Sequence, residues 1–281
     1  MAKYQDMIER NIRAAEAATD ALGDELEAIM GKVDGEYKKA VATIKTVDGP
    51  DGTIATAGDA GLANVAAADA AFVKGEAVIA EALAKMTAKG GYIDRAINAS
   101  FDLGLETFRT EQKFWGAAFS IDNDPVLAII SRKRLGNYVG EMTTDGAREI
   151  RRGVWDAIRG DISSAELPGY IRDKMAAEGI GMPLGRAKTI ARSETFAAYR
   201  ESKNQQYTAN GYEYFEYAGP LDGKTTDICA PKVGQVRTRE GWNEVDPSGM
   251  IWIYGLHYNC RHDLIGVKPE WSADIKERIV Q

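Results

Sequence analysis

Cysteine and histidine are both scarce in this sequence, which contains two residues of each type among 281. Two cysteines, Cys229 and Cys260, are too few for a disulfide scaffold of the kind that stabilises small secreted domains. The sequence also lacks any apolar run of about 18 residues, which a membrane-spanning helix requires. Its N-terminus lacks the apolar core of a signal peptide. We therefore expect a protein that is made and stays in a reducing cytoplasm, without a membrane partner.

An excess of positive charge is absent as well, since the formal net charge is −7. Residues 1–106 contain 11 Lys and Arg against 18 Asp and Glu, and this difference of −7 equals that of the whole chain. Such a composition argues against general binding of nucleic acid and leaves only a local contact with DNA. Arg132, Lys133 and Arg134 form a basic cluster, which we interpret as a solvated helix face, with a phosphate or partner contact as the alternative.

Apolar residues recur every three or four positions over the first 40 or so residues, which predicts a long amphipathic helix. The stripe consists of Tyr4, Ile8, Ile12, Ala15, Leu22, Leu26, Ile29, Val33, Tyr37, Val41 and Ile44. A helix of this length spans about 60 Å, which suits a coiled coil or docking on a partner protein. The alternative is two shorter helices that break near Gly31 or Gly35 and pack on the chain's own core.

Downstream of this segment, the pattern predicts further helices and then a small sheet. The predicted helices cover residues 62–89, 93–115, 126–139, 146–161, 163–175 and 184–211. Asp145 is expected to cap the helix that follows it, and Ser163 with Glu166 has the spacing of a capping box. Alternating apolar residues predict three strands, at residues 212–219, 235–239 and 250–255.

These elements predict an α+β protein with a long, mainly helical N-terminal region and a small C-terminal module of helices and antiparallel sheet. We expect four parts along the chain. The parts are the long N-terminal helix (1–47), a helical region (48–142), the C-terminal module (143–267) and a short tail (268–281).

Glu194 interrupts an otherwise apolar helix face. The neighbouring positions on that face are Ala187, Ile190, Ala191 and Ala198. A carboxylate there is costly to bury unless a cation or a hydrogen-bond donor accompanies it. We expect Glu194 to be a buried strut that fixes its helix on the sheet module, with Arg192, Arg186 or backbone groups as partners. A catalytic acid or base is the alternative.

Three segments, taken in order, resemble one known family. They are RAKTIARSETFAAYRE (186–201), AGPLDGKTTDIC (218–229) and LHYNCRHDLIGV (256–267). They are similar to the pattern of the Mu F-like head morphogenesis family of phage minor head proteins. That pattern runs R-A-x-x-I-A-R-T-E, then D-x-R-T-x-x-x-C, then P-x-H-x-N-C-R-C or C-R-H. The resemblance covers about residues 145–267, and its three-part order is more specific than any one part.

The resemblance assigns structural roles to five residues. These residues are Arg192, Glu194, Asp222, Thr225 and Arg261. Ser193 and Lys224 depart from the pattern, which has Thr and Arg there, and Gly255 with Leu256 occupies the place where Pro usually precedes the histidine. The turn chemistry of Asp222 and Thr225 indicates that they hold a loop together rather than perform catalysis.

The resemblance implies a virion component rather than a metabolic enzyme. Members of the family join the procapsid in few copies, associate with the portal protein and influence packaging or delivery of DNA. We therefore expect a minor structural protein at the head interior or portal vertex, with portal, capsid or scaffold proteins as partners. The alternative is a metal-dependent nuclease acting on phage DNA, because His257, Asn259 and His262 superficially resemble a His/Asn/His site, although they are nearly contiguous.

Three of the four cysteine and histidine residues lie within residues 256–264. Together, Cys229, His257, Cys260 and His262 are the number and type of ligands that bind structural zinc. Thiolates with imidazoles select zinc over magnesium or calcium. Two alternatives stay open. One is a metal-free core with buried cysteines and hydrogen-bonded histidines, and the other is a Cys229–Cys260 disulfide formed after particle release.

Overall fold

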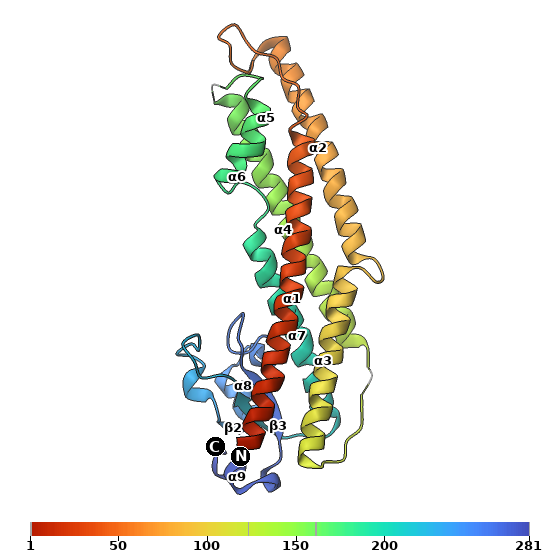
Figure 1. Cartoon of the computed structure of the whole chain (residues 1–281), viewed down its shortest axis with the longest axis vertical. Helices are drawn as coiled ribbons and strands as arrows, with labels where there is room; N and C mark the ends of the chain where they lie inside the picture. Colours follow the sequence, from red (N-terminus) through yellow and green to blue (C-terminus); the bar gives the residue numbers. More distant parts are fainter. Residues whose placement is uncertain (1, 123, 161, 281) are drawn as a thin grey trace. The chain divides into compact units, whose positions relative to one another are not determined.

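The computed structural model describes residues 2–122, 124–160 and 162–280. Figure 1 shows mostly helix along the chain and a small sheet toward the C-terminus, so the predicted α+β class is confirmed. The helices are α1 (Ala2–Val41), α2 (Gly58–Thr87), α3 (Tyr92–Trp115), α4 (Val126–Arg159), α5 (Leu167–Gly169), α6 (Met175–Ala177), α7 (Leu184–Ala209), α8 (Arg239–Val245) and α9 (Ala273–Glu277). A π turn, η1 (Tyr170–Lys174), connects α5 to α6, and η2 (Ala230–Lys232), η3 (Met250–Trp252) and η4 (Pro269–Trp271) are short 3-10 turns. Among the described helices, none combines the length and the apolar character that crossing a membrane requires.

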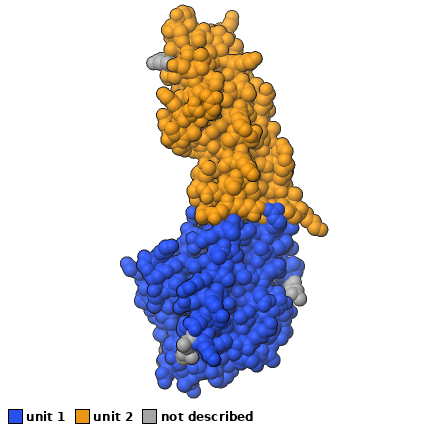
Figure 2. Space-filling model, in the orientation of Figure 1, with its two compact units in different colours: residues 1–23, 93–135, 189–281 blue, residues 24–92, 136–188 orange. Residues whose placement is uncertain are grey.

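The chain forms two compact units, each assembled from segments that are distant in sequence (Figure 2). Unit 1 consists of Met1–Gly23, Ile93–Leu135 and Thr189–Gln281, and unit 2 consists of Asp24–Tyr92 and Gly136–Lys188. Helices α1, α4 and α7 contribute residues to both units. The four parts predicted along the sequence stay a prediction.

Helix α1 is continuous, so the alternative of two helices broken at a glycine is wrong. Nine of the eleven residues of its apolar stripe are buried, and Leu22 and Ile29 are partly buried. In unit 1, Tyr4, Ile8 and Ile12 form a cluster with the strand residues Ile265 and Val267. The chain's own residues therefore cover the stripe that suggested docking on a partner, and deletion of this helix would remove part of the core of unit 1.

Helix α4 is also continuous, so the prediction that Asp145 caps a new helix is wrong. Asp145 lies inside α4 and pairs with Arg148 one turn later, at 3.1 Å. Gly146, the next residue, has a packing role, because a Cβ atom there would lie 2.5 Å from Cγ of Met182. A glycine that permits close packing and one that permits a turn look alike in sequence.

One half of the predicted capping box is present, the bond from the backbone of Ser163 to the side chain of Glu166, whereas the helix itself begins later, at Leu167. The backbone N–H of Ser163 donates a hydrogen bond to Oε2 of Glu166 at 2.8 Å, and the Ser163 hydroxyl donates to the same oxygen at 2.9 Å. These bonds precede the helical turns that run from α5 to α6.

The sheet has three antiparallel strands in the order β2-β1-β3. These are β1 (Tyr214–Ala218), β2 (Val236–Thr238) and β3 (Asp263–Val267). The first two agree with the sequence prediction, but the strand predicted at residues 250–255 is wrong. Gly249 adopts a left-handed φ of 72°, and Asp246 accepts a hydrogen bond from the N–H of Ile251 at 2.7 Å, so these residues begin the turn η3. The third strand begins directly after His262.

Both faces of the sheet are covered by side chains. Alternate residues of a strand point to opposite faces, and Tyr214 and Ala218 of β1 belong to the cluster that contains α1. Phe215 and Tyr217 belong to a second cluster with Trp242. Cys229 and Cys260 belong to this second cluster as well. The alternation of β1 therefore directs Tyr217 toward the two cysteines.

Candidate metal centre and the motif residues around it

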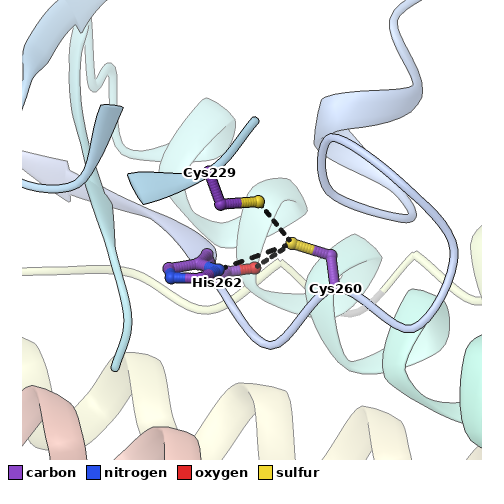
Figure 3. Close-up of side chains that lie close together, drawn as sticks. All are labelled: Cys229, Cys260 and His262. Atoms are coloured by element: carbon purple, nitrogen blue, oxygen red, sulfur yellow. Dashed lines mark hydrogen bonds between the residues drawn. The ribbon is translucent and has the colours of Figure 1, made fainter. Parts of the chain in front are cut away.

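Cys229, Cys260 and His262 point toward one another in the interior of unit 1 (Figure 3). The two Sγ atoms are 3.7 Å apart, and Sγ of Cys260 is 3.7 Å from Nδ1 of His262. The potential ligand atoms of these three residues all lie within 4.8 Å of one another. The structure thus brings together three of the four residues that the sequence analysis selected.

The turn between η3 and β3 presents two of these side chains. Asn259 adopts a φ of 60°, and Gly255 adopts a φ of 77°. A Cβ atom on Gly255 would lie 2.6 Å from Cβ of Cys260, so only glycine fits at that position. The N–H of Cys260 closes the turn by donating to the carbonyl oxygen of His257 at 3.2 Å. The backbone itself therefore aims Cys260 and His262 inward.

His262 is held with one ring nitrogen available to the sulfurs. Its Nε2 lies 3.0 Å from the carbonyl oxygen of Pro220, which can only accept a hydrogen bond, so we assign the ring proton to Nε2. The lone pair of Nδ1 then faces Cys260. Metal-binding histidines usually fix their orientation by this kind of bond to a carbonyl group. The ring also stacks on Tyr217, with centroids 5.3 Å apart and an interplanar angle of 13°.

His257 lies beside this group and contacts one of the two sulfurs. Its Nε2 is 3.3 Å from Sγ of Cys229 and 3.2 Å from Oγ1 of Thr226. Its Nδ1 is 2.8 Å from the carbonyl oxygen of Tyr258, which assigns the proton to Nδ1 and leaves Nε2 as the acceptor. The fourth predicted ligand is therefore adjacent to Cys229 but outside the set of three.

A hydrogen bond between the two thiols shifts their pKa values in opposite directions. The hydrogen bond from Cys229 lowers the pKa of Cys260, and the same bond raises the pKa of Cys229. The Tyr217 hydroxyl is 3.2 Å from Sγ of Cys229 and 3.3 Å from Sγ of Cys260. Burial raises the pKa of Tyr217, so this hydroxyl keeps its proton and donates it. The arrangement stabilises one thiolate, the form of cysteine that binds a metal.

The motif residues Asp222 and Thr225 hold the loop that leads to Cys229, as expected. Asp222 accepts hydrogen bonds from Nη1 of Arg261 and from the N–H of Lys224, both at 2.9 Å. The Thr225 hydroxyl donates to the carbonyl oxygen of Pro220 at 2.7 Å. The guanidinium of Arg261 holds the pKa of Asp222 well below its usual range. The second and third motif segments are thus tied to each other.

Helix α1 supplies acidic partners to two motif arginines. Arg192 lies 3.3 Å from a carboxylate oxygen of Asp20, and Arg261 lies 3.7 Å from one of Glu16. Because α1 carries no part of the motif, the motif pattern does not predict these contacts.

Glu194 is buried, with 2% of its surface exposed, but its partners differ from those predicted. Nε of Arg134 and the hydroxyl of Tyr254 each lie 2.8 Å from a carboxylate oxygen of Glu194. Arg134 also pairs with Glu201 at 2.8 Å. The interpretation of the basic cluster as a solvated helix face is therefore wrong for Arg134. Arg186, which we expected to pair with Glu194, pairs with Asp145 at 3.7 Å instead.

Two cations of α7 were missed because a helix rich in charge resembles a solvated one. Arg200 donates from Nη2 to the carbonyl oxygens of Cys260 and His262, at 2.6 and 2.7 Å. Lys203 lies 2.8 Å from Asp263 and 3.1 Å from Glu111. Both cations are buried, and Arg200 fixes the turn that presents the cysteine and histidine ligands.

No family model, curated protein or solved structure matches this chain.

Proposed function

We propose that this chain is a minor structural protein of a tailed-phage head, which associates with the portal or the capsid interior and assists head morphogenesis and packaging or delivery of DNA. One observation carries the proposal: the three segments that resemble the family converge in unit 1. Ser193 of the first segment bonds to Asn259 of the third at 3.2 Å, and Arg261 of the third bonds to Asp222 of the second. The motif residues thus take part together in the packing of one unit.

The chemistry of the converged segments supports a structural role. Glu194 is held by Arg134, Arg192 by Asp20, and Arg261 by Asp222. Each of these ion pairs joins segments that are distant in the sequence, so the motif charges hold unit 1 together. They support a folded module whose outer surface contacts other head proteins. The nuclease alternative gains no support from His262, which is 2% exposed.

The direct test is the protein content of assembled heads. Particles produced from the genome that encodes this chain are purified on a density gradient, and the chain is quantified against the major capsid protein by mass spectrometry. We expect a few copies per head. Its absence from purified heads would overturn the proposal.

A second test examines the portal. The full chain is co-expressed with the tagged portal protein of the same genome, and a tail-tube protein of that genome serves as the matched control. We expect the chain to co-elute with the portal protein and not with the control. Equal recovery with both would mark the association as unspecific and count against a portal contact.

We further propose that Cys229, Cys260 and His262 hold a structural zinc ion, with His257 as the fourth ligand. In a tetrahedral zinc site with usual bond lengths, two sulfur atoms lie about 3.8 Å apart, and sulfur and nitrogen lie about 3.6 Å apart. The sulfur atoms here are 3.7 Å apart, and the sulfur–nitrogen distances are 3.7 Å to His262 and 3.3 Å to His257. The spacing of Cys229, Cys260 and His262 therefore fits three ligands of a tetrahedral zinc ion, and His257, which contacts Cys229 alone, would have to move toward the other two to be the fourth.

Elemental analysis of untagged protein, purified without chelator, tests this second proposal. We expect about one zinc per chain, and a lower melting temperature in EDTA, because the free energy of metal binding is part of the free energy of folding. His262→Ala should lose the metal, and His257→Ala should bind it more weakly. Less than about a tenth of a zinc per chain, with a melting temperature unaffected by EDTA, would leave the cluster as a metal-free core.

A further inference from the structure

Lys203, Asp263 and Glu111 form a buried cluster in unit 1 that the proposed metal centre does not use. Lys203 lies on α7, Asp263 begins β3 and Glu111 lies on α3, so three elements that are distant in sequence meet here. Nζ of Lys203 is 2.8 Å from Oδ2 of Asp263 and 3.1 Å from Oε1 of Glu111. All three residues are buried. A primary amine is thus held against one carboxyl group, with a second carboxyl group beside it.

Aromatic side chains separate this cluster from water. Nζ of Lys203 lies 5.4 Å from the centre of the Tyr199 ring and 5.7 Å from the centre of the Tyr207 ring. Both tyrosines are buried, and the hydroxyl of Tyr207 donates a hydrogen bond to Oε2 of Glu111. Burying an ion pair carries a desolvation penalty that can exceed the attraction between the two ions. A reaction that converts such a pair into a neutral group removes that penalty.

We propose that Lys203 and Asp263 condense to an intramolecular amide bond, which joins α7 covalently to β3. A bond forms between Nζ of Lys203 and Cγ of Asp263, the bond between Cγ and Oδ2 breaks, and one water molecule leaves. Two of the three protons of the ammonium leave with Oδ2, and the third stays on the amide nitrogen. The step consumes no oxidant, reductant or activating group. The ion pair in the structure is the state from which the bond forms.

The fold supplies the proximity that this condensation requires. Two reacting groups that are held side by side behave as if each were present at a very high concentration, and they have no hydration shells to lose. Lys203 and Asp263 are 60 residues apart, so only the folded chain brings them together. A covalent link between them closes this length of chain and restricts the unfolded state, as a disulfide does.

Glu111 is placed to carry the protons. Its Oε1 contacts Nζ of Lys203, so it can accept a proton as the nitrogen attacks and return that proton to the leaving oxygen. Burial raises the pKa of Glu111, which makes it a stronger proton acceptor than an exposed carboxylate. Glu111 therefore has the position and the basicity of a general base.

The other oxygen of Asp263 has groups that stabilise negative charge. The N–H of Leu264 donates a hydrogen bond to Oδ1 of Asp263 at 2.9 Å, and Nε of Arg200 lies 3.7 Å from the same oxygen. Attack at Cγ places negative charge on Oδ1, and donors that already point at such an oxygen lower the barrier. Arg200 also keeps the cluster balanced, because Arg200 and Glu111 remain as one cation and one carboxylate after the bond has formed.

Lys38 and Asp34 of unit 2 provide a comparison within the same chain. Nζ of Lys38 is 3.0 Å from a carboxylate oxygen of Asp34, so the reacting groups are nearly as close as those of Lys203 and Asp263. Both side chains are 14% exposed, however, and water stabilises the two ions. We expect this pair to stay an ion pair.

The intact mass of the purified full-length chain, measured under denaturing conditions, tests the proposal. We expect the mass to fall short of that of the sequence by one water molecule. A tryptic digest should contain a branched peptide that joins Lys203 to Asp263. Trypsin should cleave after Lys38, the control, and not after Lys203. A chain with the full mass of its sequence, or a digest in which Lys203 and Asp263 lie on separate peptides, would overturn the proposal.

Two variants test the assigned roles, with tryptophan fluorescence to show that each is folded. Glu111→Gln removes the proton acceptor at nearly constant volume and should leave most chains unlinked. Asp263→Asn offers the same Cγ and should form the same amide, with loss of ammonia in place of water. A folded Glu111→Gln chain that is linked as fully as the wild type would contradict the role of Glu111.

The wild-type mass decides whether the bond exists even where a variant does not fold. These measurements use the purified chain alone, so their outcome is independent of whether the protein enters phage heads.

Discussion

Unit 1 encloses many ionisable side chains, whereas unit 2 encloses apolar residues, alanines and glycines. Among the described residues, every buried ionisable group of an acidic or basic residue belongs to unit 1. These residues are Glu111, Glu194, Arg200, Glu201, Lys203, Glu216, His262 and Asp263. The buried polar residues of unit 2 are Asn64 and Thr143.

This difference shows two ways of specifying one packed arrangement. A buried charge tolerates few geometries because it requires its partner. Unit 2 relies instead on close approach, since a Cβ atom on Gly75 would lie 2.8 Å from the ring of Tyr37, and one on Gly153 would lie 2.8 Å from Met175. We therefore expect unit 1 to be sensitive to the loss of one charge and unit 2 to be sensitive to added volume.

The largest expected effect is that of Lys203→Ala in unit 1. Burial alone would lower the pKa of Lys203, but the carboxylates of Asp263 and Glu111 raise it well above its usual value. Removing the cation leaves two buried carboxylates without it, at an expected cost of about 3–5 kcal/mol. Urea unfolding, followed by tryptophan fluorescence, measures this. The control is Lys85→Ala, which removes an exposed ion pair with Glu81 and should leave the stability unchanged. An equal loss of stability in both variants would show that burial of the lysine does not decide the cost.

Glu194→Ala should cost less than Lys203→Ala. Its partner Arg134 keeps a second carboxylate, Glu201, and so is not left alone. The lost bonds from Arg134 and from the Tyr254 hydroxyl predict a destabilisation of about 1.5–3 kcal/mol. Glu194→Gln, which retains an oxygen for Tyr254, should lie between the wild type and Glu194→Ala in the same unfolding experiment. If Glu194→Ala lost more stability than Lys203→Ala, the second carboxylate that Arg134 keeps would not be what limits the loss.

Two glycine substitutions test the packing of unit 2. Gly75→Ala places a methyl group against Tyr37 and should destabilise the chain by about 1 kcal/mol, with Tyr37 tilting to make room. Gly35→Ala, in α1 of the same unit, meets nothing within 4 Å. It should stabilise the chain by about 0.5–1 kcal/mol, because alanine is the better helix former. Opposite signs in thermal unfolding would support the packing argument, and equal signs would contradict it.

The predictable features of the fold were those set by local pattern. The α+β class, strands β1 and β2, and the burial of Glu194 follow from the spacing of apolar residues. The third strand was misplaced because residues 250–255 alternate in the same way as a strand, and only Gly249 and Asp246 decide for a turn. Periodicity also cannot identify a partner that lies far along the chain, which is why Arg134 was missed.

In the candidate site, too, the sequence analysis found the residues with a distinctive local signal and missed the others. Cys229, Cys260 and His262 were selected because their residue types are scarce and chemically distinctive. Tyr217, which bonds to both sulfurs, had no such signal, because an aromatic residue in a strand is ordinary. Arg200 likewise looked like one of many helix surface charges.

The smallest expected effect compares two exposed carboxylates, one in each unit. Arg261 lowers the pKa of Asp222 in unit 1 through a hydrogen bond across 39 residues of sequence. The N–H of Thr53 lowers the pKa of Asp51 in unit 2 across two residues. The Asp51–Thr53 bond spans only two residues and can persist in the unfolded chain, in which case it does not contribute to the free energy of unfolding. The Asp222–Arg261 contact exists only in the folded state, so it does contribute.

Asp222→Asn should therefore lower the melting temperature slightly, and Asp51→Asn should lower it less. A lowered pKa contributes stability above the carboxyl's ordinary pKa, and this contribution is lost as the pH falls through the folded-state value. The difference between wild type and Asp222→Asn should thus be constant from about pH 7 to pH 5 and shrink only below about pH 4. Melting curves across this range measure it. A difference that shrinks already near neutral pH would show that the Asp222 carboxylate is not the source of the effect.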